Sequence, residues 1–177
     1  LFAEDNSPAV RWKQHSINDQ SPYEACGAAD FNGDGKIDIF SGDSWYEAPN
    51  WTKHKVREVP PSGPNPHYYE DFSDSPLGVN GDGRMDILTP KGWLEAPADP
   101  HKENWTLHAD WEAAGHWGRI YAHDVNGDKR TDIVTSMAHD YGVMWLEQGG
   151  DGKFVKRVID DSWSQSHAMT LADLNGD

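Results

Sequence analysis

Four short stretches of this chain space oxygen-bearing side chains in a way that suits a hard divalent cation. They are DFNGDGKIDI from Asp30, GVNGDGRMDI from Gly78, DVNGDKRTDI from Asp124 and DLNGD from Asp173. Calcium binds about six to eight oxygen atoms, and alternate residues of a tight, glycine-containing loop converge on such a sphere. The first chemistry to expect from this sequence is therefore calcium binding at acidic turns.

The first stretch offers the fullest set of ligands. Side-chain oxygens stand at its positions 1, 3, 5 and 9, and position 7 can offer its backbone carbonyl. These residues are Asp30, Asn32, Asp34, Asp38 and, through its carbonyl, Lys36. Gly35 at position 6 permits the sharp turn. Position 12, where an EF-hand has a bidentate Glu, is Ser41, so we expect Asp38 to close the ligand shell.

The other three stretches offer fewer ligands or less favourable ones. Their candidate ligands are Asn80, Asp82, Asp86 and the carbonyl of Arg84; Asp124, Asn126, Asp128, Asp132 and the carbonyl of Arg130; and Asp173, Asn175 and Asp177. Gly78 stands where the second stretch should have its first acid, and Lys129 replaces the position-6 glycine of the third. Asn-Gly-Asp is also ordinary turn chemistry, but a turn does not need the acid at position 9. We therefore expect one structural Ca²⁺ per repeat, which pins the turn and neutralises its acids.

The acidic stretches recur about every 48 residues, a period typical of repeat architectures. Two other sequence segments recur with the same period. A Trp-Glu segment follows each of the first three (WYEAP from Trp45, WLEAP from Trp93, WLEQGG from Trp145). An aromatic residue opens an alternating run at WKQHSI from Trp12, WTKHKV from Trp51, WTLHAD from Trp105 and FVKRVI from Phe154. Strands alternate apolar and polar residues in this way.

Each repeat therefore offers four short strands, the fourth being a small-residue segment that leads into the acidic turn, such as ACGAAD or HAMTLAD. Four antiparallel strands per repeat is typical of a β-propeller blade. The expected fold is all-β, a fragment of about three and a half propeller blades, with a β-solenoid as the alternative. The expected blades cover residues 21–59, 66–113, 115–160 and, incomplete, 164–177.

Composition limits the possible partners. The chain has 177 residues, a formal net charge of −15 and nine tryptophans. This charge disfavours nucleic acid and anionic membrane surfaces, and no apolar run is long enough for insertion into a membrane. The single cysteine, Cys26, excludes an internal disulfide framework and is expected to be a buried, small core residue. No signal peptide is visible, and the chain stops inside its fourth stretch, so we expect further blades or domains in the parent chain.

The pattern D-x-N-G-D-G-x-x-D-[IL], followed by a Trp/Tyr-Glu strand, resembles the FG-GAP/VCBS calcium-binding propeller repeats, which also form the integrin α-chain head. The resemblance covers essentially the whole chain and implies a calcium-stabilised propeller. Calcium is abundant outside the cytosol, so an extracytoplasmic location, secreted or periplasmic, is expected. The last segment, from Asp160, also resembles the propeller of aldos-2-ulose dehydratase and related bacterial proteins of sugar metabolism.

Reactive side chains gather in the segments that lead into the small-residue strands, which lie at one mouth of a propeller's axial channel. Ligand binding through ring stacking and hydrogen bonds is expected at Tyr23, Glu24, Tyr68, Tyr69 and Trp117. Proton transfer, if the protein is an enzyme, is expected at His167, His116 and Glu70. Alternatively, His67, His116 and His167 share a second divalent metal with a carboxylate. His15, His54 and His108 share one slot of the aromatic-led run and are expected to be strand-face residues.

Two functions remain open on this evidence. In the first, the protein is an extracytoplasmic binding scaffold whose loops present a site to a carbohydrate or protein ligand. In the second, it is the propeller portion of a dehydratase, isomerase or lyase that acts on keto-sugars. Substitution of His167 distinguishes them, because it should abolish turnover only in the second case.

Overall fold

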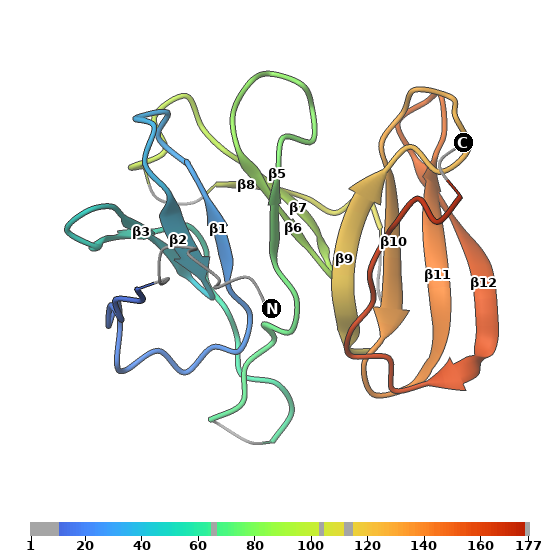
Figure 1. The fold of residues 1–177 in the computed structure, drawn as a ribbon, viewed down its shortest axis with the longest axis horizontal. Helices are drawn as coiled ribbons and strands as arrows, with labels where there is room; N and C mark the ends of the chain where they lie inside the picture. Colours follow the sequence, from blue (N-terminus) through green and yellow to red (C-terminus); the bar gives the residue numbers. More distant parts are fainter. Residues whose placement is uncertain (1–10, 65–66, 103–104, 112–114, 176–177) are drawn as a thin grey trace, which may run out of the picture.

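The chain folds into twelve β-strands that form three separate four-stranded sheets (Figure 1). The structure, a computed structural model, describes residues 11–64, 67–102, 105–111 and 115–175. Within these ranges there is no helix, so the all-β expectation is confirmed. The described residues accordingly include no helix that could cross a membrane.

Each sheet is antiparallel, with its strands paired in chain order. The first contains β1 (Gly27–Ala29), β2 (Asp38–Ser41), β3 (Ser44–Glu47) and β4 (Thr52–Lys55). The second contains β5 (Ser75–Leu77), β6 (Asp86–Thr89), β7 (Gly92–Glu95) and β8 (Thr106–His108). The third contains β9 (Trp117–His123), β10 (Asp132–Met137), β11 (Tyr141–Gln148) and β12 (Phe154–Ser164). Each acidic turn thus joins the first and second strands of its sheet.

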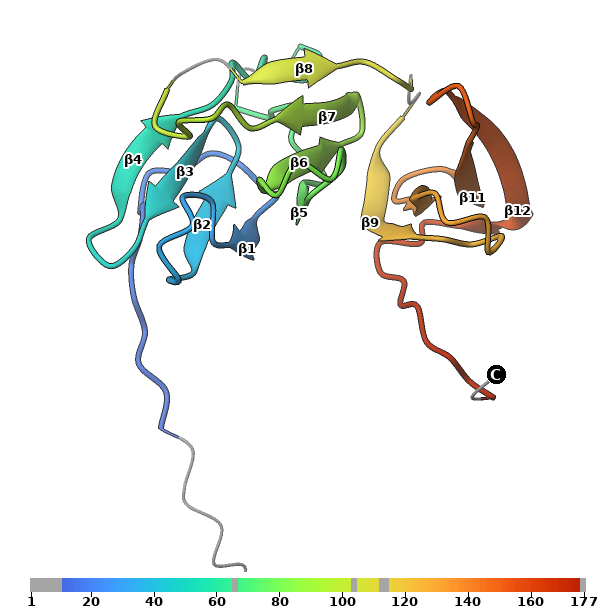
Figure 2. The same ribbon diagram turned by 90° about the horizontal axis from the view of Figure 1, so that it is seen from above.

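The three sheets follow one another along an arc (Figure 2). The first strands, β1, β5 and β9, are neighbours in space, whereas β4, β8 and β12 lie on the outer side. Strands that crowd together at one edge of each sheet have little room for side chains, which explains the small residues of β1. The described residues form an open arc of blade-like sheets and no closed ring.

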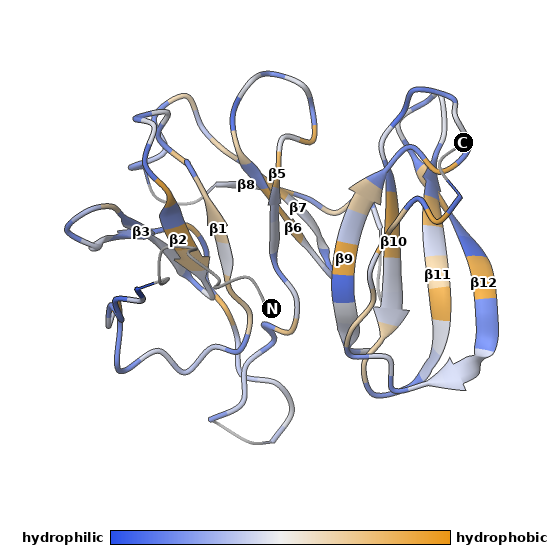
Figure 3. Cartoon of the chain, in the orientation of Figure 1, coloured by the Kyte–Doolittle hydropathy of each residue, from blue (hydrophilic) through white to orange (hydrophobic). Residues whose placement is uncertain are grey.

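Two hydrophobic cores fill the spaces between the sheets. Phe40 and Trp45 of the first sheet pack against Ile87 and Leu94 of the second. The opposite face of the second sheet, with Leu88 and Trp93, packs against Ile133 and Leu146 of the third. Alternation along the strands gives each sheet an apolar side chain for either face, and apolar bands cross β10, β11 and β12 in Figure 3. Trp145 is only half-buried because no described sheet covers its face.

Three expectations about local structure are wrong. The run from Trp12 forms no strand, and the Trp12 side chain is 92% exposed. Residues 165–175, which include the small-residue segment HAMTLAD, form none either. A strand needs a neighbouring strand to pair with, and within the described residues neither run pairs with a strand of the three sheets. Cys26 is exposed rather than buried, and it lines a cavity rather than a core between sheets.

Candidate functional site

The first acidic turn is organised around the carboxylate of Asp30. Its Oδ1 accepts hydrogen bonds from the backbone N–H groups of Gly33 (2.7 Å) and Asp34 (3.1 Å), and its Oδ2 accepts one from Gly35 (2.8 Å). Gly33 and Gly35 have φ angles of 75° and 82°, a region that glycine adopts without steric cost. The chain therefore wraps closely around a single carboxylate.

The third acidic turn repeats this arrangement with a strained residue. Asp124 accepts hydrogen bonds from Gly127, Asp128 and Lys129 at 2.8, 3.0 and 2.8 Å. Lys129 adopts a φ of 69°, a region in which a side chain strains the backbone. Gly35, at the same position of the first turn, has no side chain and avoids this strain. In the second turn Gly78 provides no carboxylate, so the equivalent N–H groups lose this acceptor. In the fourth, Asp173 accepts a hydrogen bond from Asn175, and Asp177 lies outside the described residues.

The acid at position 9 is fully buried in each of the first three turns and holds two distant parts of the sheet. Asp38 accepts hydrogen bonds from the backbone N–H groups of Phe31 (3.0 Å) and Ala48 (2.8 Å). The equivalent donors are Val79 and Ala96 for Asp86, and Val125 and Gln148 for Asp132. Burial raises the pKa of Asp86, and its two backbone hydrogen bonds oppose that rise. This structural role adds to the metal-ligand role expected from the spacing.

A basic residue at position 7 neutralises the acid at position 5 in each of these turns. The ion pairs are Lys36 with Asp34, Arg84 with Asp82 and Arg130 with Asp128. The hydrogen bond from the Lys36 ammonium lowers the pKa of Asp34. The two arginines also donate through Nε to the carbonyls of Ala96 and Gln148, at 2.7 Å each. Their side chains thus tie the turn to the end of β7 or β11.

The chemistry of these side chains fits calcium. The first turn gathers carboxylate, amide and carbonyl oxygens, which hard cations prefer as ligands, and a bound cation would replace the Lys36 ammonium on Asp34. The ligands would be those expected from the spacing: Asp30, Asn32, Asp34 and Asp38, with the carbonyl of Lys36. A bound cation would neutralise three acids of one turn and stabilise the wrapped loop.

Five of the residues expected at the mouth line two cavities, whereas Tyr23, Tyr68 and Tyr69 line neither. Glu70 and His116 line a cavity of about 440 Å³ between the first two sheets, where Glu70 forms an ion pair with Lys91. Glu24 and His167 line a second cavity of about 300 Å³. The structure therefore brings His116 and Glu70 together but places His167 at the other cavity. Trp117 borders the second cavity but is only 2% exposed, so its ring packs in the core and offers no face for stacking.

His139 connects the two cavities and was not among the expected site residues. Its ring makes edge contacts with those of His116 (centroids 5.2 Å apart) and His167 (4.8 Å). His116 in turn packs against Phe72 at 3.9 Å and lies near Tyr68 at 6.4 Å. The repeat gave no signal for His139, because the aligned units offer no equivalent histidine.

A buried charge cluster supports the walls of the second cavity. Arg57 donates to Asp71 Oδ1 and to Asp74 Oδ2, both at 2.7 Å, and both carboxylates are almost fully buried. Burial raises the pKa of Asp74 well above its ordinary value, Arg57 opposes the rise, and Asp71 adds to it. Asp74 Oδ1 has no hydrogen-bond donor among the described residues. Asp74 is among the residues that line the cavity, but this oxygen is itself buried, so it offers no contact to a ligand there.

Two of the three expected tyrosines, Tyr23 and Tyr69, pack against each other. The rings of Tyr23 and Tyr69 are 5.2 Å apart in an edge-to-face arrangement. Burial, followed by the charge of Asp43, raises the pKa of Tyr23 to about 12. A Cβ atom on Gly42 would lie 2.0 Å from the Tyr23 ring, so only glycine fits the β2–β3 turn here. Tyr23 is thus a packing residue at the edge of the first sheet as well as a candidate ligand contact.

Comparison with known proteins identifies one part of the chain. Residues 108–177 match the FG-GAP-like repeat family. This stretch contains β9 to β12 and the third and fourth acidic turns, and the match supports the resemblance drawn from those motifs. The crystal structure of the V. cholerae biofilm matrix protein Bap1 is similar at 19% identity with a TM-score of 0.44. That similarity covers 73% of this chain and 19% of Bap1, so the chain spans about a fifth of that protein.

No curated protein matches the chain. The matches do not support the resemblance of the last segment to the propeller of aldos-2-ulose dehydratase.

Proposed function

We propose that this protein is a calcium-stabilised, extracytoplasmic β-repeat scaffold that binds a carbohydrate or protein ligand at its concave side. The observation that carries the calcium part is the identical wrapping of the first and third turns around Asp30 and Asp124. A turn needs no such carboxylate, whereas a cation site does. The FG-GAP-like repeat match over residues 108–177 supports the β-repeat scaffold part of the proposal.

The ligand site of this scaffold is the cavity of about 300 Å³. Glu24, Arg119, His139 and His167 line it with donors and acceptors. Such a mixed set suits the hydroxyl groups of a sugar, because each hydroxyl both donates and accepts. The net charge of −15 disfavours polyanionic ligands, so a neutral carbohydrate is the first class to test.

The calcium part is tested by ion content and thermal unfolding. Purified protein is expected to retain bound calcium after desalting, and a strong chelator should remove it and lower the Tm. Retention of the Tm after complete ion removal would contradict the proposal.

The ligand part is tested with a panel of neutral polysaccharides immobilised on a surface, in buffer with calcium. Glu24→Ala and His167→Ala are expected to abolish binding of whichever polysaccharide is captured. Glu58→Ala is the matched control, because Glu58 is an exposed glutamate outside that cavity. Equal loss in the control, or no binding to the panel and to candidate proteins, would contradict the ligand proposal while leaving calcium binding untouched.

A second candidate, a lyase or dehydratase acting on keto-sugars, rests on the row of three imidazoles from His116 through His139 to His167. Imidazoles exchange protons near neutral pH, so such a row suits proton transfer next to a carbonyl. Turnover of a 2- or 3-keto sugar that His167→Ala abolishes, with the fold intact, would support it. Absence of turnover across a keto-sugar panel would exclude it.

A further inference from the structure

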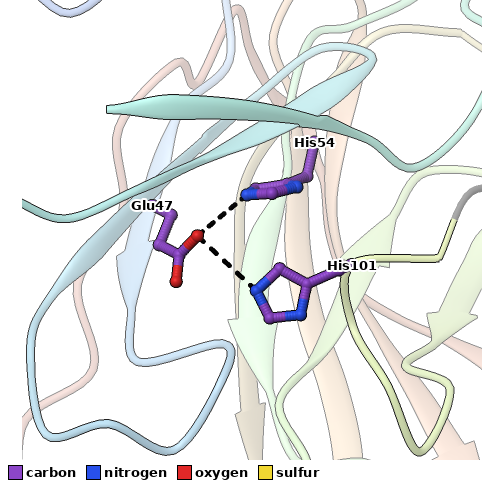
Figure 4. Close-up of side chains that lie close together, drawn as sticks. All are labelled: Glu47, His54 and His101. Atoms are coloured by element: carbon purple, nitrogen blue, oxygen red, sulfur yellow. Dashed lines mark hydrogen bonds and ion pairs between the residues drawn. The ribbon is translucent and has the colours of Figure 1, made fainter. Parts of the chain in front are cut away.

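A group of metal-binding side chains lies outside the acidic turns, where the first two sheets meet (Figure 4). Glu47 ends β3, His54 lies on β4, and His101 comes from the segment between β7 and β8. Glu47 Oε2 is 2.9 Å from His54 Nε2 and 3.5 Å from His101 Nε2. We infer that these three residues form a binding site for a borderline divalent cation such as Zn²⁺.

The ligand types distinguish this site from the calcium turns. Two imidazole nitrogens and one carboxylate oxygen suit zinc, whereas calcium prefers oxygen alone. The three ligand atoms lie within 4.8 Å of one another. Tetrahedral zinc with bonds of about 2.0–2.2 Å holds its ligands roughly 3.3–3.6 Å apart. Small adjustments are therefore needed: Glu47 Oε2 and His54 Nε2, now 2.9 Å apart, must separate slightly, and any longer ligand separation must shorten, which the exposed position of His101 permits.

Neighbouring side chains already orient two of the ligands. Asp99 Oδ1 lies 3.0 Å from His101 Nδ1, so the other ring nitrogen of His101 faces Glu47. Asn32 Nδ2 donates to Glu47 Oε1 at 2.9 Å, which leaves Oε2 for the cation. A carboxylate on the far nitrogen of a histidine and a hydrogen bond to the far oxygen of a carboxylate are typical supports of metal ligands.

The segment that carries His101 is docked on the first sheet. Trp45 Nε1 donates to the carbonyl of Pro100 at 3.1 Å. The ring of His54 stacks on Trp45 at 4.5 Å, and that of His101 lies 5.5 Å from the same indole. A cation bound here would join β3 and β4 of the first sheet to the β7–β8 segment of the second.

The other two sheets contain natural controls. In the second sheet Glu95 pairs with His108 at 2.7 Å, and His108 stacks on Trp93 at 4.2 Å. In the third, Arg157 replaces the histidine and pairs with Glu147 at 2.8 Å. Among the described residues, only the first sheet adds a third ligand to this pair. The Glu–His pair alone is thus a repeated strand-face contact, and His101 with Asp99 is what makes the first copy a candidate site.

The test uses the full chain, without a polyhistidine tag and with calcium in excess so that the acidic turns are saturated. Co²⁺ is added as a probe, because its visible spectrum reports tetrahedral nitrogen and oxygen ligation, and Zn²⁺ is then added as a competitor. One Co²⁺ per chain is expected, displaced by Zn²⁺, with a higher Tm when zinc is bound. His101→Gln should weaken binding by more than about tenfold, and Asp99→Asn by about tenfold.

His108→Gln is the matched control and should leave the cobalt spectrum and the zinc affinity unchanged. Three results would overturn the inference: no Co²⁺ or Zn²⁺ bound by the calcium-loaded chain, equal loss in His108→Gln, or full binding in His101→Gln. His54→Gln is a further variant, but His54 is packed on Trp45. Should it unfold, the exposed substitutions at His101 and Asp99 decide the outcome. Because calcium occupies the acidic turns throughout, the cobalt and zinc results test this site independently of the calcium proposal.

Discussion

The carboxylate of Asp38 accepts a hydrogen bond from the backbone N–H of Ala48, ten residues further along the chain, at 2.8 Å. Its other oxygen accepts one from Phe31. A single buried side chain therefore ties the start of the acidic turn to the end of the β2–β3 hairpin. Asp86 and Asp132 do the same in the other sheets.

Asp38→Ala is expected to lower the free energy of unfolding by about 2–4 kcal/mol, because two buried N–H groups lose their acceptor. Since these hydrogen bonds need no cation, the loss should appear in chelator as well as in calcium. Urea unfolding under both conditions measures it.

Asp34→Ala is the control for that prediction, because Asp34 is paired with Lys36 at the surface of the same turn. Its stability in chelator should match that of the native protein, and only the gain produced by calcium should shrink. If Asp38→Ala lost stability only in calcium, its role would be that of a metal ligand alone.

Lys129→Gly is expected to stabilise the third turn by up to about 1 kcal/mol, because glycine adopts the φ of 69° without steric cost. It also removes a positive charge next to the candidate cation site. Thermal unfolding in chelator measures the first effect, and calcium titration measures the second. A lower Tm in chelator would contradict the strain argument.

Asp74→Asn is expected to leave stability at pH 7 unchanged or higher. Burial raises the pKa of Asp74, so the folded protein keeps a proton that the unfolded chain releases. The free energy of unfolding should therefore fall as the pH rises from the ordinary aspartate pKa through the raised one, and Asp74→Asn should remove this slope. Urea unfolding at pH 5 and pH 8 tests it.

Arg57→Met, in the same charge cluster, is expected to lower stability, in contrast to Asp74→Asn. It leaves the buried Asp71 and Asp74 without their cation and is expected to cost about 3–5 kcal/mol. If Asp74→Asn proved as damaging as Arg57→Met, then Asp74 would be needed in its charged form.

Tyr23→Phe should change how steeply the free energy of unfolding falls with pH in the alkaline range. The pKa of Tyr23 is raised to about 12, so between pH 10 and 12 the unfolded chain releases a proton that the folded protein keeps. Stability should fall with pH in this window and be fully present below it. The variant is expected to show a smaller fall between pH 10 and 12 in urea midpoints, and equal slopes in the two proteins would contradict the assignment.

The sequence was sufficient to predict the strands after each acidic turn, because their alternation and the Trp-Glu segments recur at fixed spacing. It also indicated that the acid at position 9 matters beyond turn formation. It could not show that this acid accepts two backbone hydrogen bonds, since no pattern indicates that the N–H of Ala48 approaches Asp38.

The residues of the candidate sites, too, were predicted only in part from the sequence. Periodicity aligned His54 with His108 and correctly placed both on a strand face, where each pairs with a glutamate. His101 and His139 lie in connecting segments, and the other repeats have no histidine at the equivalent positions. Alignment of the repeats therefore could not identify them as site residues. The burial of Trp117 and the exposure of Cys26 depend on how the sheets pack together, which the spacing of residues along the chain does not indicate.

The hydrogen bonds of Asp38 also bear on how the chain reaches its native state. They span residues 31 to 48, so every contact that closes the first hairpin lies within one short stretch. Such a stretch can order itself before the next one has been synthesised, since little loop-closure entropy opposes it. Hydrogen exchange should then reveal three cooperative opening units, one for each sheet, rather than one global event.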